Sequence, residues 1–144
     1  MFRASSFFSH RRCRFDDDRC NAFSCTFFNR FINDDEVTVF FSGADLVVQP
    51  YRSATQSGVT QIAYHFEKPM VVTDVGGLAE IVPDGICGYI VKPEPEKIAD
   101  ALNDYFYNNR QEKLAIGVRL EKAKFTWDKL TASIMEVYNL AGKG

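Results

Sequence analysis

Three short, valine-containing apolar runs alternate with helical patterns through the middle of this 144-residue sequence. They cover residues 44–50, 69–73 and 88–91, and each is bounded by proline or glycine. Apolar runs of this length are typical of strands that are buried on both faces of a parallel sheet. The order strand, helix, strand, turn, strand, helices therefore predicts an α/β domain with a parallel sheet covered by helices.

Helical periodicity and capping residues predict the segments that cover this sheet. Helices are expected over 35–42, 59–66 and 78–82, from Pro93 and Pro95 to a break at Asn108, from about 114 to 124, and from a cap at Thr126 onward. The helix over 59–66 follows Thr55 and Ser57, either of which can cap its first turn. The last helix is expected to turn its apolar side chains into the core: Trp127, Leu130, Ile134, Val137 and Tyr138.

The composition changes sharply near residue 28, which divides the chain into 1–28 and 29–144. Residues 1–28 hold seven of the 13 phenylalanines and three of the four cysteines, but no Leu, Ile, Val, Gly, Pro, Glu or Lys. A packed segment needs branched aliphatic residues, and a disordered tail is poor in aromatic residues. We interpret residues 1–28 as a frameshifted or misread stretch joined to a genuine domain. The alternative is an unusual aromatic, disordered N-terminal arm.

Charge and cysteine spacing exclude several classes of partner. The formal charge is −2, so a polybasic nucleic-acid-binding or membrane-surface protein is not expected. No apolar run approaches about 18 residues, and no signal peptide is recognisable at the start, so neither a transmembrane segment nor secretion is predicted. The four cysteines and two histidines lack the spacing of a zinc site, and no metal is assigned. The expected location is the cytoplasm, with attachment to the inner face of the membrane left open.

Two polar, glycine-containing loops follow the first two predicted strands. One covers 53–58 and the other 74–77, and both are expected at the edge where open parallel sheets bind ligands. A helix that starts near Gly58 would direct free backbone N–H groups and a partial positive charge at that edge, which suits a phosphate or diphosphate. Thr55 and Ser57 add hydroxyl groups. The pattern is neither a P-loop nor a dinucleotide fingerprint.

The order of these motifs resembles the C-terminal half of retaining GT-B glycosyltransferases of family 4. The resemblance covers about 29–142 and includes the helix that begins at Trp127. It rests on the following segments: 44–51, 53–66, 67–82, Asp84–Gly85 and 88–91. The fold it implies is a Rossmann-like, three-layer parallel sheet that forms part of a GT-B C-terminal domain.

The resemblance also implies a donor substrate and the residues that hold it. The donor of such enzymes is a nucleotide sugar, usually of UDP or GDP, and no further cofactor is needed. Basic side chains and helix-terminal N–H groups, rather than a required metal, stabilise the leaving diphosphate. The candidate substrate-binding residues are Arg52, Thr55, Gln56, Ser57, Gly58 and Gln61, and Gly76 and Gly77 are expected to line the cleft.

Two departures from the family pattern affect this expectation. The family often places two glutamates around the donor loop, but the matching positions are Ala54 and Ile62, and no carboxylate lies from 53 to 66. Gln56 and Gln61 could offer neutral hydrogen bonds instead. The N-terminal acceptor domain, the first strands of the donor domain and the family's basic phosphate-binding pair are also missing.

The function expected from these observations is glycosyl transfer from a nucleotide sugar to an unknown sugar or lipid acceptor. This chain would carry only the donor-binding portion and would be inactive alone, since the catalytic cleft forms between two domains. The alternatives are a non-catalytic nucleotide-sugar-binding module, an inert gene remnant, or part of a sugar-nucleotide epimerase of the same two-domain fold.

Overall fold

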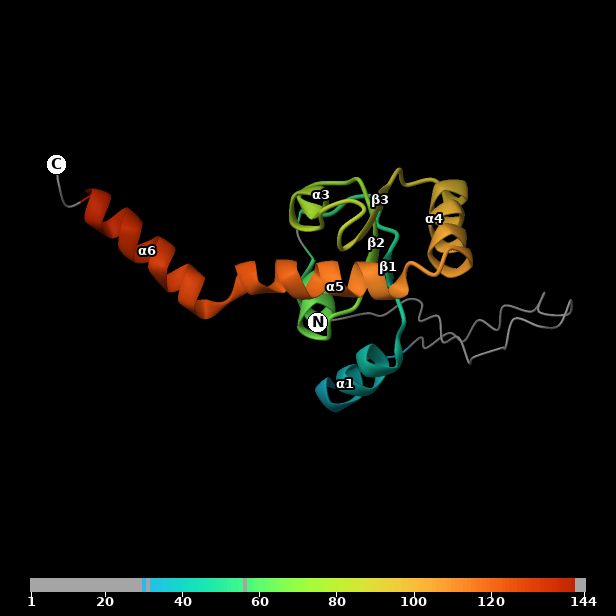
Figure 1. Ribbon diagram of the computed structural model, residues 1–144, viewed down its shortest axis with the longest axis horizontal. Helices are drawn as coiled ribbons and strands as arrows, with labels where there is room; N and C mark the ends of the chain where they lie inside the picture. Colours follow the sequence, from blue (N-terminus) through green and yellow to red (C-terminus); the bar gives the residue numbers. More distant parts are fainter. Residues whose placement is uncertain (1–29, 31, 56, 142–144) are drawn as a thin grey trace, which may run out of the picture.

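The computed structural model describes residues 30, 32–55 and 57–141. Helices and strands alternate as far as the third strand, and only helical elements follow (Figure 1). The elements are α1 (Asp34–Gly43), β1 (Val47–Gln49), α2 (Gly58–His65), β2 (Met70–Thr73), α3 (Leu78–Ile81), β3 (Gly88–Val91), α4 (Pro95–Tyr107), α5 (Gln111–Lys122), the 3-10 turn η1 (Ala123–Phe125) and α6 (Trp127–Ala141). The three predicted strands and all predicted helices are present, with small shifts at their ends.

The three strands form one parallel sheet in the order β1-β2-β3. Val48 of β1 pairs with Val71 of β2, and Val72 pairs with Ile90 of β3. All four residues of the central strand β2 are buried. A strand buried on both faces explains the unbroken apolar run in the sequence, and it confirms the predicted parallel sheet.

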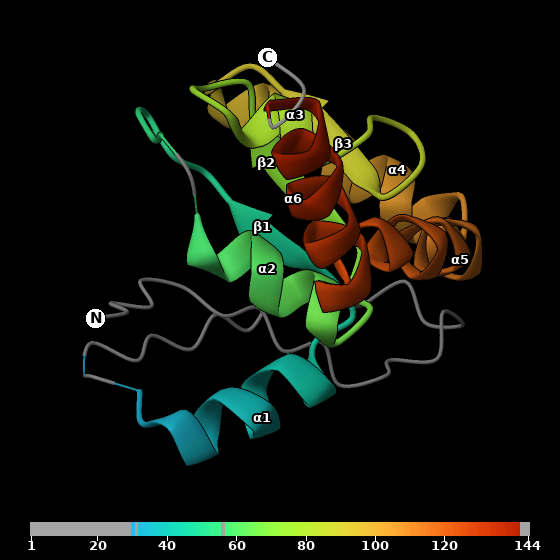
Figure 2. The same cartoon turned by 90° about the vertical axis from the view of Figure 1, so that its left-hand side faces the viewer.

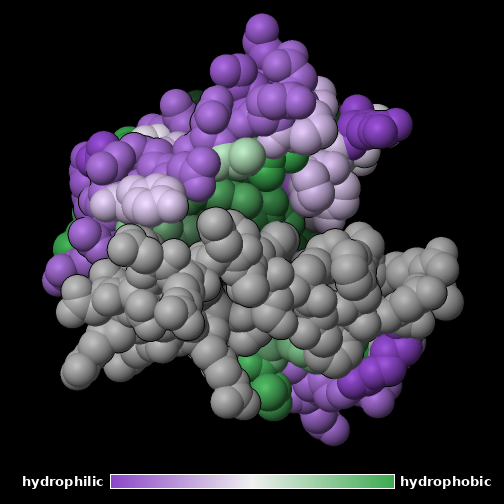
Figure 3. All heavy atoms as spheres, turned by 90° about the vertical axis from the view of Figure 1, so that its right-hand side faces the viewer, coloured by the Kyte–Doolittle hydropathy of each residue, from purple (hydrophilic) through white to green (hydrophobic). Residues whose placement is uncertain are grey.

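Helices cover both faces of the sheet, which gives the three layers expected. Alternate residues of β2 face opposite sides: Met70 and Val72 belong to a core cluster that includes Tyr64 of α2 and Val118 of α5. The helix α4 contacts β2 and β3, and the Tyr105 hydroxyl donates a 2.7 Å hydrogen bond to a carbonyl just before β1. The side of the molecule nearest α4 shows a largely hydrophilic surface in its upper part (Figure 3).

The last helix does not pack as the sequence suggested. Trp127, Ile134, Val137 and Tyr138 are between 57% and 81% exposed, and α6 extends away from the sheet (Figure 1). The side chain of Leu130 lies outside the described residues. Helical spacing correctly predicted a common apolar face, but spacing alone carries no information on what that face contacts. The expectation that this face points into the core is therefore wrong.

Proline, asparagine and acidic residues mark the helix ends as expected. The helix α4 begins at Pro95 and is capped at Asn108, and α1 begins with three acidic residues. In the part of the chain that the structure describes, no helix is both long and apolar enough to cross a membrane.

Candidate functional site at the carboxyl edge of the sheet

The loops that follow β1 and β2 pack directly against each other. The Gly77 N–H donates a 3.1 Å hydrogen bond to the carbonyl of Thr55. Gly76 has a φ of 56°, and a Cβ at this position would overlap the carbonyl oxygen of Ala54. Gly76 is therefore required here both by its backbone conformation and by the close approach of the neighbouring loop, and a Cβ on Gly77 would lie 2.9 Å from the Thr55 carbonyl oxygen. The structure brings the two predicted loops together at one edge.

Side chains from both strands fix the start of α2 above this edge. Thr73, the last residue of β2, donates a 2.7 Å hydrogen bond to the carbonyl of Tyr51. The Tyr51 hydroxyl lies 3.3 Å from the Ser57 hydroxyl at the helix start. One helical turn into α2, the buried Thr60 hydroxyl donates to the side-chain carbonyl of Gln49 at 3.0 Å. This network joins β1, β2 and the first turn of α2.

The N-terminus of α2 is not capped by its own cap residue. Ser57 has the extended conformation of an N-cap, but its side chain makes no capping hydrogen bond; its hydroxyl contacts Tyr51 instead. Backbone N–H groups in the first turn of a helix have no partners within the helix, and they carry the positive end of its dipole. In α2 the Thr60 N–H donates to the Ser57 carbonyl at 3.2 Å, so an anionic oxygen at this helix start would meet the N–H groups of Gly58 and Val59.

The far end of α2 is also anchored. The Tyr64 hydroxyl donates a 2.7 Å hydrogen bond to the carbonyl of Ile81, at the end of α3. Burial raises the pKa of Tyr64 far above its ordinary value, so this hydroxyl remains a donor at any physiological pH. Since α3 follows the Gly76–Gly77 loop, this bond helps to fix both loops relative to each other.

Five of the predicted site residues lie together at this edge of the sheet: Thr55, Ser57, Gly58, Gly76 and Gly77. Arg52 is exposed in the loop between β1 and α2. Gln56 lies outside the described residues. Gln61 is exposed on α2, one turn after Gly58, and it lines a separate hollow.

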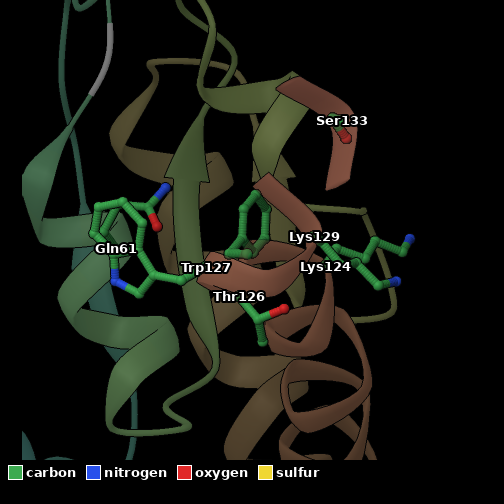
Figure 4. Close-up of a pocket in the computed structure, with 7 residues that line it drawn as sticks. Gln61, Lys124, Thr126, Trp127, Lys129 and Ser133 are labelled. Atoms are coloured by element: carbon green, nitrogen blue, oxygen red, sulfur yellow. The ribbon is translucent and has the colours of Figure 1, made fainter. Parts of the chain in front are cut away.

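That hollow lies where the chain leaves the body to form α6 (Figure 4). Its volume is about 650 Å³, and its lining residues are Gln61, Lys124, Phe125, Thr126, Trp127, Lys129 and Ser133. Gln61 and Trp127 lie on the same side of it in Figure 4, with the two lysines opposite. None of the residues that line it carries a carboxylate.

Sequence reasoning missed the polar residues that support the site. Gln49 and Thr60 are 1% and 0% exposed, and the Gln49 side-chain nitrogen has no hydrogen-bond partner among the described residues. The available signal was a single polar residue at the end of an otherwise apolar strand, facing a threonine one turn into the next helix. Asp74, which follows β2, supplies an exposed carboxylate at the same edge.

The described residues contain no group of three or more His, Cys, Asp or Glu side chains arranged to hold a metal ion. What this edge offers is a set of hydroxyl and backbone N–H donors at a helix start. Such a set can bind an anionic group through hydrogen bonds without a metal.

Comparison with known proteins defines the family. Residues 15–108 match the family described as "Glycosyl transferases group 1". A D-inositol 3-phosphate glycosyltransferase of Paenarthrobacter aurescens is 33% identical over 112 residues, which cover 76% of this chain and 27% of the relative. An uncharacterized glycosyltransferase of Methanocaldococcus jannaschii is 31% identical over 107 residues, with 72% and 30% covered.

A solved structure has the same fold. The sucrose-phosphate synthase of Thermosynechococcus elongatus superposes with a TM-score of 0.68 at 22% identity, over 82% of this chain and 30% of that one. The chain thus belongs to the group 1 glycosyltransferases, the retaining family 4 enzymes of GT-B fold. It spans less than a third of the length of these relatives.

Proposed function

We propose that this chain binds the diphosphate of a nucleotide-sugar donor at the N-terminus of α2. The observation that carries the proposal is the uncapped first turn of α2, which lies at the carboxyl edge of the sheet beside the Gly76–Gly77 loop. Family membership supports a nucleotide sugar as the ligand. UDP and GDP sugars are the donors to test first.

Each candidate residue has a distinct role in this proposal. The backbone N–H of Gly58 and the hydroxyls of Thr55 and Ser57 donate hydrogen bonds to the diphosphate oxygens. Arg52 adds a positive charge from the adjoining loop, and Gln56 and Gln61 bind the sugar or ribose in place of the glutamates common in the family. The same donors would stabilise the diphosphate as it leaves with its developing negative charge.

We further propose that the chain alone binds donor without transferring the sugar. The matched regions cover 27% and 30% of these relatives, and an acceptor site would have to come from polypeptide outside the matched region. Several relatives are named D-inositol 3-phosphate glycosyltransferases. An acceptor of that kind is one candidate for a complete enzyme. A cytoplasmic location stays a prediction that cell fractionation would test.

A non-catalytic module or an inert remnant is the competing function. It is favoured by one observation, the absence of carboxylates from 53 to 66, where the family often carries two. A module would still bind a nucleotide sugar, whereas a remnant would bind none. Donor binding therefore separates the remnant from the other two, and transfer activity in the presence of a complementing acceptor domain separates the enzyme from the module.

The test is calorimetric titration of the purified chain with UDP, GDP, ADP and their common sugar conjugates. We expect saturable binding of one nucleotide series. Gly58→Asp should weaken it at least about ten-fold, or about 1.4 kcal/mol, because a carboxylate at the helix start takes the place of the diphosphate.

The matched control is Gln111→Asp, which adds the same charge to the start of α5. An acidic residue in a first turn is favourable for a helix, so neither variant should lose its fold. Unchanged affinity in Gly58→Asp, or no binding of any nucleotide by the folded protein, would contradict the proposed site.

A further inference from the structure

The contact between β1 and α2 changes from apolar to polar at the end of the strand. Figure 2 shows α2 beside β1. Val47 and Gln49 lie on the same face of β1, because alternate residues of a strand point to the same side. Val47 belongs to the core cluster that includes Ala63 and Tyr64 of α2. Gln49 instead accepts a 3.0 Å hydrogen bond from the buried hydroxyl of Thr60.

This polar pair is not the arrangement that gives the most stable core. The Gln49 side-chain nitrogen is buried and has no hydrogen-bond partner in the part of the chain that the structure describes. A buried donor without a partner costs free energy, and two apolar side chains of similar shape avoid that cost. Departures of this kind from an apolar core are expected at functional sites.

The position of the pair indicates which site it serves. Thr60 is the third residue of α2, and its N–H donates to the Ser57 carbonyl at 3.2 Å. The two N–H groups before it, those of Gly58 and Val59, are the donors that remain for an anion at this helix start. The hydrogen bond between Thr60 and Gln49 thus joins the end of β1 to the residue that directly follows these two donors.

The backbone of Gln49 is itself held in place. Its carbonyl accepts hydrogen bonds from the Tyr51 N–H at 3.0 Å and from the Thr73 hydroxyl at 3.3 Å. Gln49 also pairs in register with Val72 of the central strand β2. Because its backbone is fixed at the edge of the sheet, the bond from its side chain to Thr60 sets where the first turn of α2 lies relative to that edge.

We propose that Gln49 and Thr60 are positioning residues for the diphosphate of the donor. Their hydrogen bond holds the first turn of α2 so that the N–H groups of Gly58 and Val59 can bind one anionic group together. Donors that are ordered in advance bind more tightly than donors that must be ordered on binding. An apolar pair would hold the helix by packing, which is not directional. This inference rests on the proposed function and names the buried residues on which its affinity depends.

The test compares the wild type with the double variant Gln49→Leu with Thr60→Val, by calorimetric titration with inorganic pyrophosphate, UDP and GDP. The double variant should keep a urea midpoint close to that of the wild type, because both polar groups are removed together. It should bind pyrophosphate and the preferred nucleotide about three- to ten-fold more weakly, the equivalent of one hydrogen bond. Thr60→Ser keeps the hydroxyl and should bind as tightly as the wild type.

The matched control removes a buried hydrogen bond just before the other end of β1. Tyr105→Phe deletes the hydroxyl that donates to the Asp45 carbonyl at 2.7 Å. It should lower the urea midpoint and leave the affinity for anions unchanged. If the double variant does not fold, Gln49→Met takes its place, since it keeps the length of the side chain without the amide. The Thr60 hydroxyl can then donate to a carbonyl of its own helix, and binding should weaken by the same factor.

Three results would overturn the positioning role while leaving the proposed function intact. The first is wild-type affinity in the folded double variant or in Gln49→Met. The second is equal weakening by Thr60→Ser, since affinity would then depend on packing at this position rather than on the hydrogen bond. The third is equal weakening by Tyr105→Phe, since affinity would then follow stability alone. A folded wild type that binds none of the three anions would instead contradict the proposed function, and the positioning role with it.

Discussion

Several glycines in the described part of the chain, among them Gly76, Gly88 and Gly117, are required by space rather than by backbone flexibility alone. A Cβ on Gly76 would overlap the carbonyl of Ala54, and one on Gly117, within α5, would overlap the carbonyl of Ile86. Gly43, at the end of α1, has open space where its Cβ would be. Because Gly117 and Gly43 both lie in helices, they separate the effect of packing from the general cost of glycine in a helix.

Gly117→Ala should destabilise the protein although alanine is the better helix former. Helix propensity favours alanine by about 1 kcal/mol, but overpacking at a buried contact costs about 1–3 kcal/mol. We expect a lower urea midpoint for Gly117→Ala and an unchanged or slightly higher one for Gly43→Ala. Equal stabilisation by both substitutions would show that α5 does not approach the loop at Ile86 as closely as described.

The buried pair of Gln49 and Thr60 should respond asymmetrically to substitution. Thr60→Val removes the hydroxyl that donates to Gln49 and leaves a buried amide without a partner, at a cost of about 1–3 kcal/mol. Replacing both residues, as in Gln49→Leu with Thr60→Val, removes the unpaired groups together and should recover most of that loss. Urea unfolding of the two single variants and the double variant gives the comparison. If the double variant lost as much unfolding free energy as the two single variants together, this expectation would be contradicted.

The helices show which features of the sequence were sufficient to predict where an element begins and ends. Acidic residues at 34–36, proline at 95 and asparagine at 108 act within one turn of chain, and each marked a real helix end. The orientation of α6 could not be predicted in the same way, because what the face of Trp127 and Tyr138 contacts depends on distant parts of the structure. Local chemistry thus predicts where helices begin and end better than what they pack against.

The start of α1 should make stability depend on pH. The Arg30 guanidinium, aided by the Asn33 N–H at 3.2 Å, lowers the pKa of Glu36 to about 2 from its ordinary 4.5. A carboxylate whose pKa falls on folding stabilises the native state above its unfolded pKa, and this contribution is lost as the pH falls from about 4.5 to about 2.

Thermal unfolding of the wild type and of Glu36→Gln at a series of pH values measures this contribution. The difference in Tm between them should be present at neutral pH and shrink as the pH falls through that window. It should also decrease with added salt, since the ion pair is exposed. A difference that is independent of pH would mean that Glu36 stabilises α1 by other means.

At the scale of the whole molecule, the fold was more predictable than the site. A strand that is buried on both faces has a continuous apolar sequence, such as residues 69–73. The presence of a sheet with parallel strands could therefore be inferred directly. The supporting contacts of the site could not, because Gln49 and Thr60 are 11 residues apart and meet only when α2 folds back on β1. The contact between Gly77 and Thr55 likewise joins two loops separated by a helix and a strand.

The central claim is that the N-terminus of α2 binds the diphosphate of a nucleotide sugar. The most direct measurement is an NMR titration of the ¹⁵N-labelled chain with UDP and GDP, followed through the backbone amides. We predict the largest shifts at Gly58 and Val59 in the first turn of α2, with a further shift at Gly77 in the loop that contacts Thr55. Shifts confined to the hollow near Lys124 and Trp127, or no shifts in a folded protein, would contradict the claim.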